Sequence, residues 1–163
     1  MSTTKNPCSS KKTLNISNIK ESIKIFDEIV EQYDKPLKTD PIFEIFNSTK
    51  PPRISIHDFI DRIIKYCKID VATFVTMMIY IDKAREVVQF TNFNIHKIIL
   101  GSMICSIKYC NDEIYPNTFY ARVGGIDLEE MNVIEITFCA LLGFDFYVNH
   151  EIYFQYESYC IDE

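Results

Sequence analysis

The sequence predicts an all-α domain, a five-helix globule around a central helix, with flanking N- and C-terminal helices. Along most of the chain, apolar residues recur at steps of three and four, which places them on one face of a helix. No segment shows a convincing alternation of apolar and polar residues, the pattern of a half-buried strand. The segment from Ile98 to Asn111 is apolar or small almost all round, so we expect it to be the central helix, packed by neighbours on several sides.

The 163 residues are enough for one domain with its own core, and they divide into three parts. Residues 1–15 are polar and lack an apolar run, so we expect a disordered leader rather than a secretory signal. Residues 16–50 carry one helical segment and a linker punctuated by prolines. The pair Pro51-Pro52 marks a boundary, because residues before proline avoid the helical region, and the main domain with its C-terminal helix is predicted over 51–163.

The N-terminal helix is expected from Asn18 to Tyr33, with Ser17 as its N-cap. Its apolar residues step by three and four: Ile19, Ile23, Phe26, Val30 and Tyr33. This single apolar face predicts that the helix packs on the main domain.

Four longer helices and one short helix are expected after the proline pair. Ser55 caps the first, with Asp58 completing a capping box, and Asp70 caps the second. The central helix begins after Thr91 or Asn92 and ends at Cys110. The remaining segments are a short helix at 118–123, a helix at 128–142 and an aromatic C-terminal helix at 149–160.

The composition argues against several classes of partner. The net charge is −6 with an isoelectric point near 5.1, and Lys and Arg form no stripe, so nucleic acid is a poor partner. No apolar run approaches the roughly 18 residues that a membrane-spanning helix needs. The six cysteines form no CxxC pair, which favours reduced, buried thiols and a cytoplasmic or nuclear location. They are Cys8, Cys67, Cys105, Cys110, Cys139 and Cys160.

No constellation of residues predicts catalysis, a metal site or a cofactor. His57, His96 and His150 lie in separate segments with no nucleophile motif nearby, and we expect the first two on the surface. Cys105 and Cys110 are five apart, so on a helix their side chains diverge and do not readily share a metal. No Gly-rich phosphate loop ending in Lys is present.

Two isolated charges interrupt the most apolar segments. Lys108 is the only charged residue in IILGSMICSIKYCN, and Glu135 is the only one in MNVIEITFCALLGF. An unpaired charge on a buried face costs several kcal/mol, so each must pair or reach water. One interpretation is that the two pair with each other or reach the rim. The other is that they mark the edge of an apolar groove that binds the backbone of a partner, and both can hold together.

The adjacent glycines Gly124 and Gly125 are half of the four glycines in the chain. Glycine tolerates a positive φ, so one or both can reverse the chain after the short helix. Asp127 follows as the expected N-cap of the next helix, with Glu130 at N3 as in a capping box. We therefore expect a helix corner, which sets the direction in which Glu135 points.

Several motifs in register resemble the cyclin box. They are RISIHDFIDRIIKY, then MMIYIDKA, then FNIHKIILGSMICSIKYCNDEIYPNTFYARVGGIDLEEMNVIEITFCALLGFDF. Together they cover about residues 51–160 and are most similar to the P/U-type cyclins, the group related to the phosphate-sensing cyclin of yeast.

This resemblance implies a five-helix cyclin fold that binds a cyclin-dependent protein kinase. Such a protein supplies no chemistry and favours the active kinase by binding that conformation better, which seats the kinase C-helix and orders the activation loop. In the family, a Lys that ends the third helix of the box and a Glu in the fifth bind the kinase segment leading into its C-helix. The matching residues are Lys108 and Glu135.

The resemblance implies further roles with less weight. Asp82 matches an Asp that forms a structural ion pair with an Arg of the first box helix, here Arg53 or Arg62. Asp112 and Glu113 match acids that can face arginines of the kinase activation loop, although a solvated loop fits them equally well.

One departure from the wider family keeps an alternative open. Classical cyclins carry a second helical box, which this sequence has no room for, although P/U-type cyclins commonly manage with one. The alternative is a cyclin-fold adaptor that binds another protein without activating a kinase.

Overall fold

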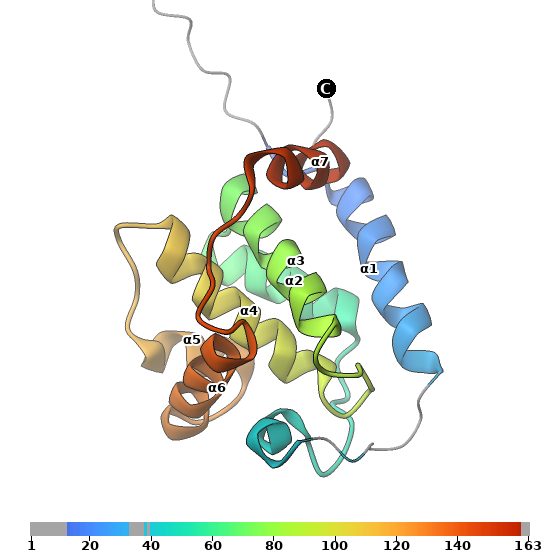
Figure 1. Cartoon of the computed structure of the whole chain (residues 1–163), viewed down its shortest axis with the longest axis vertical. Helices are drawn as coiled ribbons and strands as arrows, with labels where there is room; N and C mark the ends of the chain where they lie inside the picture. Colours follow the sequence, from blue (N-terminus) through green and yellow to red (C-terminus); the bar gives the residue numbers. More distant parts are fainter. Residues whose placement is uncertain (1–12, 33–37, 39, 161–163) are drawn as a thin grey trace, which may run out of the picture.

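The computed structural model describes residues 13–32, 38 and 40–160 (Figure 1). Within these residues the chain forms seven α-helices and one 3₁₀ helix, and no strand. In chain order they are α1 (Ile16–Glu31), η1 (Pro41–Phe46), α2 (Ile56–Cys67), α3 (Val71–Arg85), α4 (Ile95–Cys110), α5 (Asn117–Gly124), α6 (Leu128–Leu141) and α7 (His150–Cys160). The all-α prediction is confirmed, whereas most of the predicted leader, Cys8 and Tyr33 lie outside the described residues.

The central helix is α4, as the sequence predicted. It contacts α2, α3, α6 and η1, and Figure 1 shows it crossing the middle of the domain. Its buried side runs without a break from Ile98 to Ile107. A helix enclosed on several sides has no polar face to present, which explains the nearly continuous apolar sequence of α4.

The helix caps follow the predicted chemistry. The Ser55 hydroxyl accepts from the backbone N–H of Asp58 at 3.0 Å and donates to its carboxylate at 2.8 Å. The Asp70 carboxylate accepts from the N–H of Thr73 at 2.8 Å. These caps satisfy backbone donors that the first turn of a helix leaves without partners, so they fix where α2 and α3 begin.

α4 and α6 approach each other closely at Gly101. A Cβ added to Gly101 would lie 2.7 Å from a ring carbon of Phe138, closer than side chains pack. Phe138 is fully buried there and meets the equally buried Phe46 edge-on, with 6.3 Å between ring centroids. The contact between the two helices therefore requires a residue without a side chain at position 101.

The two adjacent glycines serve different purposes. Gly125 has φ +71° and caps α5, so it is the residue that reverses the chain. Gly124 ends α5 and has no positive φ, but a Cβ there would lie 2.8 Å from the Leu100 methyl groups. Asp127 then caps α6 by accepting from the N–H of Glu130 at 2.8 Å. The corner is confirmed, with one glycine for the turn and one for packing.

The N-terminal helix begins earlier than predicted. Asn15, not Ser17, is the N-cap, because its extended backbone lets the side-chain oxygen accept from the N–H of Ser17 at 2.8 Å. Ser17 lies within the first turn. The predicted inner face of α1 is buried at Ile19, Ile23, Phe26 and Val30, and Figure 1 shows α1 beside α7 at one edge of the domain.

η1 belongs to the same core as the helices that follow it. Phe46 is fully buried against α6, and Lys97 of α4 donates to the Ile45 carbonyl at 3.2 Å. The N–H of Ser48 donates to the Phe93 carbonyl at 2.8 Å. The proline pair at 51 and 52 therefore marks a change of local structure, while packing continues across it.

Candidate functional site

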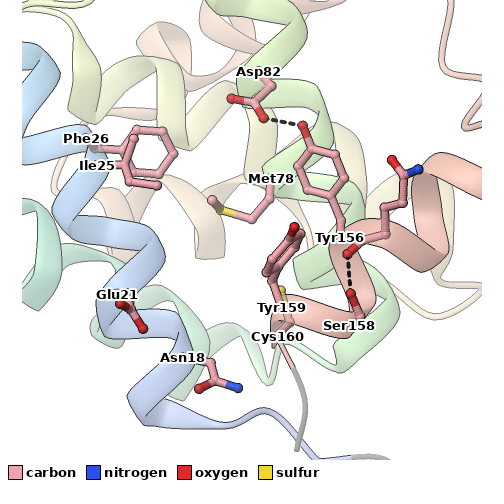
Figure 2. A pocket seen from close by; sticks show the side chains of 11 residues that line it. Asn18, Glu21, Ile25, Phe26, Met78, Asp82, Tyr156, Ser158, Tyr159 and Cys160 are labelled. Atoms are coloured by element: carbon pink, nitrogen blue, oxygen red, sulfur yellow. Dashed lines mark hydrogen bonds between the residues drawn. The ribbon is translucent and has the colours of Figure 1, made fainter.

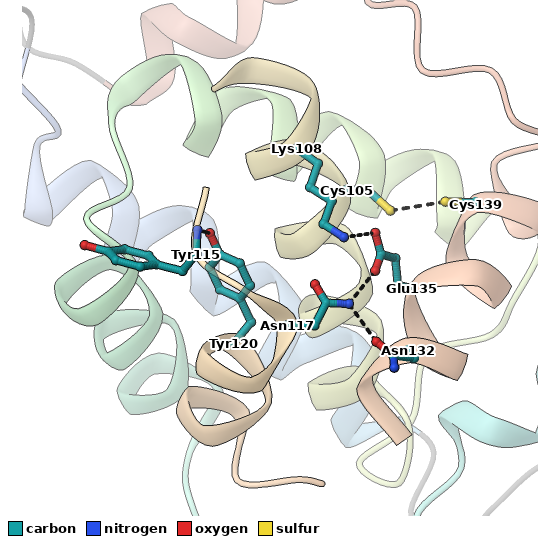
Figure 3. A network of polar contacts seen from close by, with 8 residues as sticks. All are labelled: Cys105, Lys108, Tyr115, Asn117, Tyr120, Asn132, Glu135 and Cys139. Carbon is teal, nitrogen blue, oxygen red and sulfur yellow. Dashed lines mark hydrogen bonds and ion pairs between the residues drawn. The ribbon is translucent and has the colours of Figure 1, made fainter. Parts of the chain in front are cut away.

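The structure brings the two isolated charges of the sequence together. The Lys108 ammonium nitrogen, in the last turn of α4, lies 2.6 Å from Oε1 of Glu135 on α6 (Figure 3). The Lys108 side chain is 32% exposed and the Glu135 side chain is 21% exposed. The ion pair therefore lies near the surface, where solvent can reach it. The interpretation that the two charges pair with each other is confirmed, and their role at the edge of a partner-binding groove stays a prediction.

A third helix contributes to this network. Asn117, the first residue of α5, donates from Nδ2 to Oε2 of Glu135 at 2.7 Å and to Oδ1 of Asn132 at 2.8 Å. Both carboxylate oxygens of Glu135 are thus held, one by a charge and one by an amide. We name Lys108, Asn117, Asn132 and Glu135 the polar cluster. Sequence reasoning missed Asn117, since an Asn at a helix start is common and carries no mark of a distant partner.

Exposed aliphatic side chains lie on the same helix as Glu135. Val133 is 40% exposed and Ile136 is 62% exposed. Tyr109, next to Lys108, is 52% exposed. An ion pair that is partly shielded from water can bind polar backbone groups of a docking segment, and exposed apolar side chains on the same helices can add contact area.

Asp112 and Glu113 lie exposed in the loop between α4 and α5. In the described part of the chain neither forms an ion pair, and the structure does not connect them to the polar cluster. The loop is held instead by the N–H of Tyr115, which donates to the Tyr120 hydroxyl at 3.0 Å (Figure 3). Their role in binding stays a prediction.

The expected ion pair of Asp82 with Arg53 or Arg62 is wrong for this structure. Among the described residues, Asp82 forms no ion pair with either arginine, and its carboxylate instead accepts from the hydroxyl of Tyr156 on α7 (Figure 2). A phenol satisfies a half-buried carboxylate without bringing a second charge into the contact. Burial first, and then this hydrogen bond to Asp82, raise the pKa of Tyr156.

The contact of Asp82 with Tyr156 borders a cavity of about 760 Å³ between α1, α3 and α7. Figure 2 shows Phe26 and Ile25 on the α1 side and Tyr156 and Tyr159 on the α7 side. Sequence reasoning gave no sign of this cavity, because its walls come from three helices that lie far apart in the sequence.

His96 is half-buried, although the sequence predicted it on the surface. Its Nε2 lies 2.9 Å from the Ile54 carbonyl, and its ring tilts against Phe59 with 5.1 Å between centroids. Nδ1 is buried without a hydrogen-bond partner among the described residues. The neutral ring therefore donates from Nε2, and burial lowers the pKa of His96, opposed in part by the bond to Ile54.

The described residues hold no group of three or more His, Cys, Asp or Glu placed to bind a metal ion. In the same part of the chain, no helix has the length and apolar character required to cross a membrane.

Comparison with known proteins agrees with this geometry. The model of the cyclin family matches residues 3–146, most of the chain. Cyclin-U4-2 of Arabidopsis thaliana is 33% identical over 136 residues, which cover 82% of this chain and 62% of that protein. The PHO85 cyclin-like protein psl1 of Schizosaccharomyces pombe is 34% identical over 111 residues, covering 66% of this chain and 46% of that protein. Cyclin-P4-1 of Oryza sativa subsp. japonica is 32% identical over 118 residues, 71% of this chain and 54% of that protein.

The match begins ahead of the proline pair, in agreement with the packing of η1 into the core. The chain spans about half to three fifths of the length of these curated relatives. The all-helical fold, the motifs and the match over residues 3–146 together show that this chain belongs to the cyclin family, as a cyclin of the P/U type.

Proposed function

We propose that this chain binds a cyclin-dependent protein kinase through the polar cluster and activates it. The observation that carries the proposal is the ion pair between Lys108 and Glu135, which is partly exposed and held in place by the Asn117 amide. The names of its relatives, which include a PHO85 cyclin-like protein, support the same class of partner.

The polar cluster can bind the backbone of a partner because its groups have hydrogen-bond donors and acceptors beyond those used within the cluster. An ammonium group carries three N–H donors, so Lys108 can donate to a partner carbonyl while it stays near Glu135. A carboxylate accepts several hydrogen bonds, so Glu135 can take a partner amide as well. Asn117 holds Glu135 in place before binding, which lowers the entropy cost of ordering the site.

Activation follows if the kinase segment fits this surface only when its C-helix is seated. A binding protein shifts a conformational equilibrium by the difference between its affinities for the two states. The cyclin surface then needs no catalytic group, and its contribution is the free energy of binding to the active state. Asp112 and Glu113, exposed beside α5, are placed in this proposal as secondary contacts to arginines of the activation loop.

The test measures binding and kinase activity with purified cyclin-dependent kinases from the organism that supplies the gene. Lys108→Ala and Glu135→Ala are each expected to weaken binding by about 1–3 kcal/mol, which is the cost of removing one side of a charge-assisted contact. Both variants should keep the helical circular dichroism of the unchanged protein.

A second ion pair between the same helices provides a matched control. Lys97 of α4 lies 2.7 Å from Glu130 of α6, with side chains 16% and 27% exposed. Glu130→Ala removes this pair while Lys97 keeps its bond to the Ile45 carbonyl, and it should leave binding unchanged. Equal losses in Glu130→Ala and Glu135→Ala would contradict the assigned surface. Binding without a gain in kinase activity would instead identify the chain as a cyclin-fold adaptor.

A further inference from the structure

A pair of thiols lies beside the polar cluster. The Sγ atoms of Cys105 on α4 and Cys139 on α6 are 3.7 Å apart, and Figure 3 shows them facing each other. Each lies about one helical turn from its charged neighbour, Cys105 from Lys108 and Cys139 from Glu135. We propose that this dithiol is a modification site, which a hydroperoxide converts into a disulfide that links α4 to α6.

The close packing of α4 on α6 is compatible with such a link. A disulfide requires Cα atoms within roughly 4.4–6.8 Å of each other and an S–S bond of about 2.05 Å. Helices approach closely where small residues meet, and Gly101, one turn before Cys105, allows Phe138 to pack directly against α4. Cys139 follows Phe138 in sequence, so the thiols lie next to this close approach, with 3.7 Å between their sulfur atoms.

The other described cysteines have different neighbours. Cys67 faces the Met103 sulfur at 3.8 Å, Cys110 faces the Thr76 hydroxyl at 3.4 Å, and Cys160 is buried at the end of α7. In the part of the chain that the structure describes, Cys105 and Cys139 are therefore the cysteines whose thiols touch. This contrast supplies internal controls within one protein.

The two thiols differ in how readily they react. Cys139 is partly exposed, whereas Cys105 is 5% exposed. Burial above all, and then the neighbouring Cys139, raise the pKa of Cys105, so its thiol is a poor nucleophile toward peroxide and loses its proton only as the disulfide forms. Cys139 is therefore the thiol that meets the oxidant, and Cys105 is the thiol that resolves the product.

The chemistry balances in two steps. The Cys139 sulfur attacks hydrogen peroxide, an S–O bond forms as the O–O bond breaks, and one water leaves, which gives a sulfenic acid. The Cys105 sulfur then attacks the Cys139 sulfur, the S–S bond forms as the S–O bond breaks, and the hydroxide leaves with the Cys105 proton as a second water. Two thiols lose two electrons in total, and one peroxide gains them.

The experiment treats the purified full chain with hydrogen peroxide, alkylates free thiols, digests it in acid and maps peptides by mass spectrometry. We expect a cross-linked peptide that joins Cys105 to Cys139, formed while the helical circular dichroism is intact and lost on adding dithiothreitol. Recovery of both residues as alkylated thiols while the exposed Cys110 is oxidised would overturn the proposal. A cross-link that appears only after the helical signal is lost would also overturn it.

Variants test the order of the two steps. In Cys105→Ser the cross-link should be lost, and a 1,3-diketone probe should label a sulfenic acid at Cys139. In Cys139→Ser the same exposure should leave Cys105 unlabelled, and Cys67→Ser should keep the cross-link. Labelling of Cys105 in the Cys139→Ser variant would reverse the assignment. The peptide map of the unchanged chain decides the main point even where a variant fails to fold, and none of these readouts involves a kinase.

Discussion

Glu135 on α6 and Asp82 on α3 are both half-buried carboxylates on helices that pack against the core, yet they are held in different ways. Glu135 is bound by the Lys108 ammonium group at 2.6 Å and by the Asn117 amide at 2.7 Å. Asp82 is bound by the hydroxyl of Tyr156, from the C-terminal helix. One site is an ion pair between neighbouring box helices, and the other is a neutral donor from a flanking helix.

The difference shows which partners a sequence can reveal. Lys108 and Glu135 each interrupt an apolar run, and the cost of burying either charge alone predicts that each pairs or reaches water. The structure shows that they pair with each other. The partner of Asp82 was inferred from a family pattern with an Arg. Tyr156 is one of several aromatic residues on α7, and its role is visible only when α7 is placed against α3.

The largest expected effect comes from disturbing the packing of α4 against α6, the helix that contains Glu135. Gly101→Ala puts a methyl group against the fully buried Phe138, and we expect the free energy of unfolding to fall by about 2 kcal/mol, typical for an overpacked core. Denaturant titration measures it. Gly124→Ala is the matched control, because its methyl group meets the movable ends of Leu100 and should cost less. Equal losses would show that α4 and α6 have room to separate.

The next effect concerns the contact between α3 and α7. Tyr156→Phe removes the donor to Asp82, and we expect the free energy of unfolding to fall by about 1 kcal/mol, since solvent partly replaces the lost bond. Tyr153→Phe makes the same change one turn earlier, where the hydroxyl donates to Glu157 within α7 at 3.3 Å, and should cost less. If Tyr156→Phe costs no more than Tyr153→Phe, the contact does not hold α7 in place.

Added salt should affect the interactions of Glu135 and Asp82 differently. Glu135→Gln keeps the shape of the side chain but removes the charge, and we expect a loss of about 0.5–1 kcal/mol of stability, because the pair is partly exposed. Added salt should shrink that loss by screening the ion pair, whereas the loss in Tyr156→Phe should change little. Unfolding titrations at low and high salt give both values. A similar salt response in the two variants would contradict the distinction between them.

The smallest expected effect is a pH dependence of stability that comes from His96. This residue contacts neither Glu135 nor Asp82. Burial lowers the pKa of His96 in the folded state below its unfolded value of about 6.5, so the unfolded chain binds more protons at mildly acidic pH. Stability from this group is complete above about pH 6.5 and is lost as the pH falls below it. The slope of stability against pH should be shallower in His96→Gln. An unchanged slope would assign the dependence to other groups.

Local chemistry made part of this fold predictable. The caps at Ser55, Asp70 and Asp127 were predicted because each depends on a residue and its own first turn. The central position of α4 was predicted because apolar or small residues occupy nearly every face of this helix. These features are fixed by short stretches of sequence.

The rest depends on contacts between distant segments. His96 is half-buried only because the residues before α2 and the ring of Phe59 pack over it. The amide of Asn117 reaches Glu135 only because α5 lies against α6. The contact between Cys105 and Cys139 also depends on how distant helices pack. The sequence of two separate helices does not reveal how close their cysteines lie.

The backbone N–H of Asn15 donates to the carbonyl of Cys160 at 3.0 Å, and α1 packs against α7. During synthesis on a ribosome, α1 leaves the exit tunnel first among the described helices and α7 leaves last. The apolar face of α1 therefore lacks one of its covers until nearly all of the described chain has been made. Contacts between residues this far apart in sequence slow folding and leave apolar surface open to other chains in the meantime. The edge formed by α1 and α7 is where we expect a nascent chain to need a chaperone most.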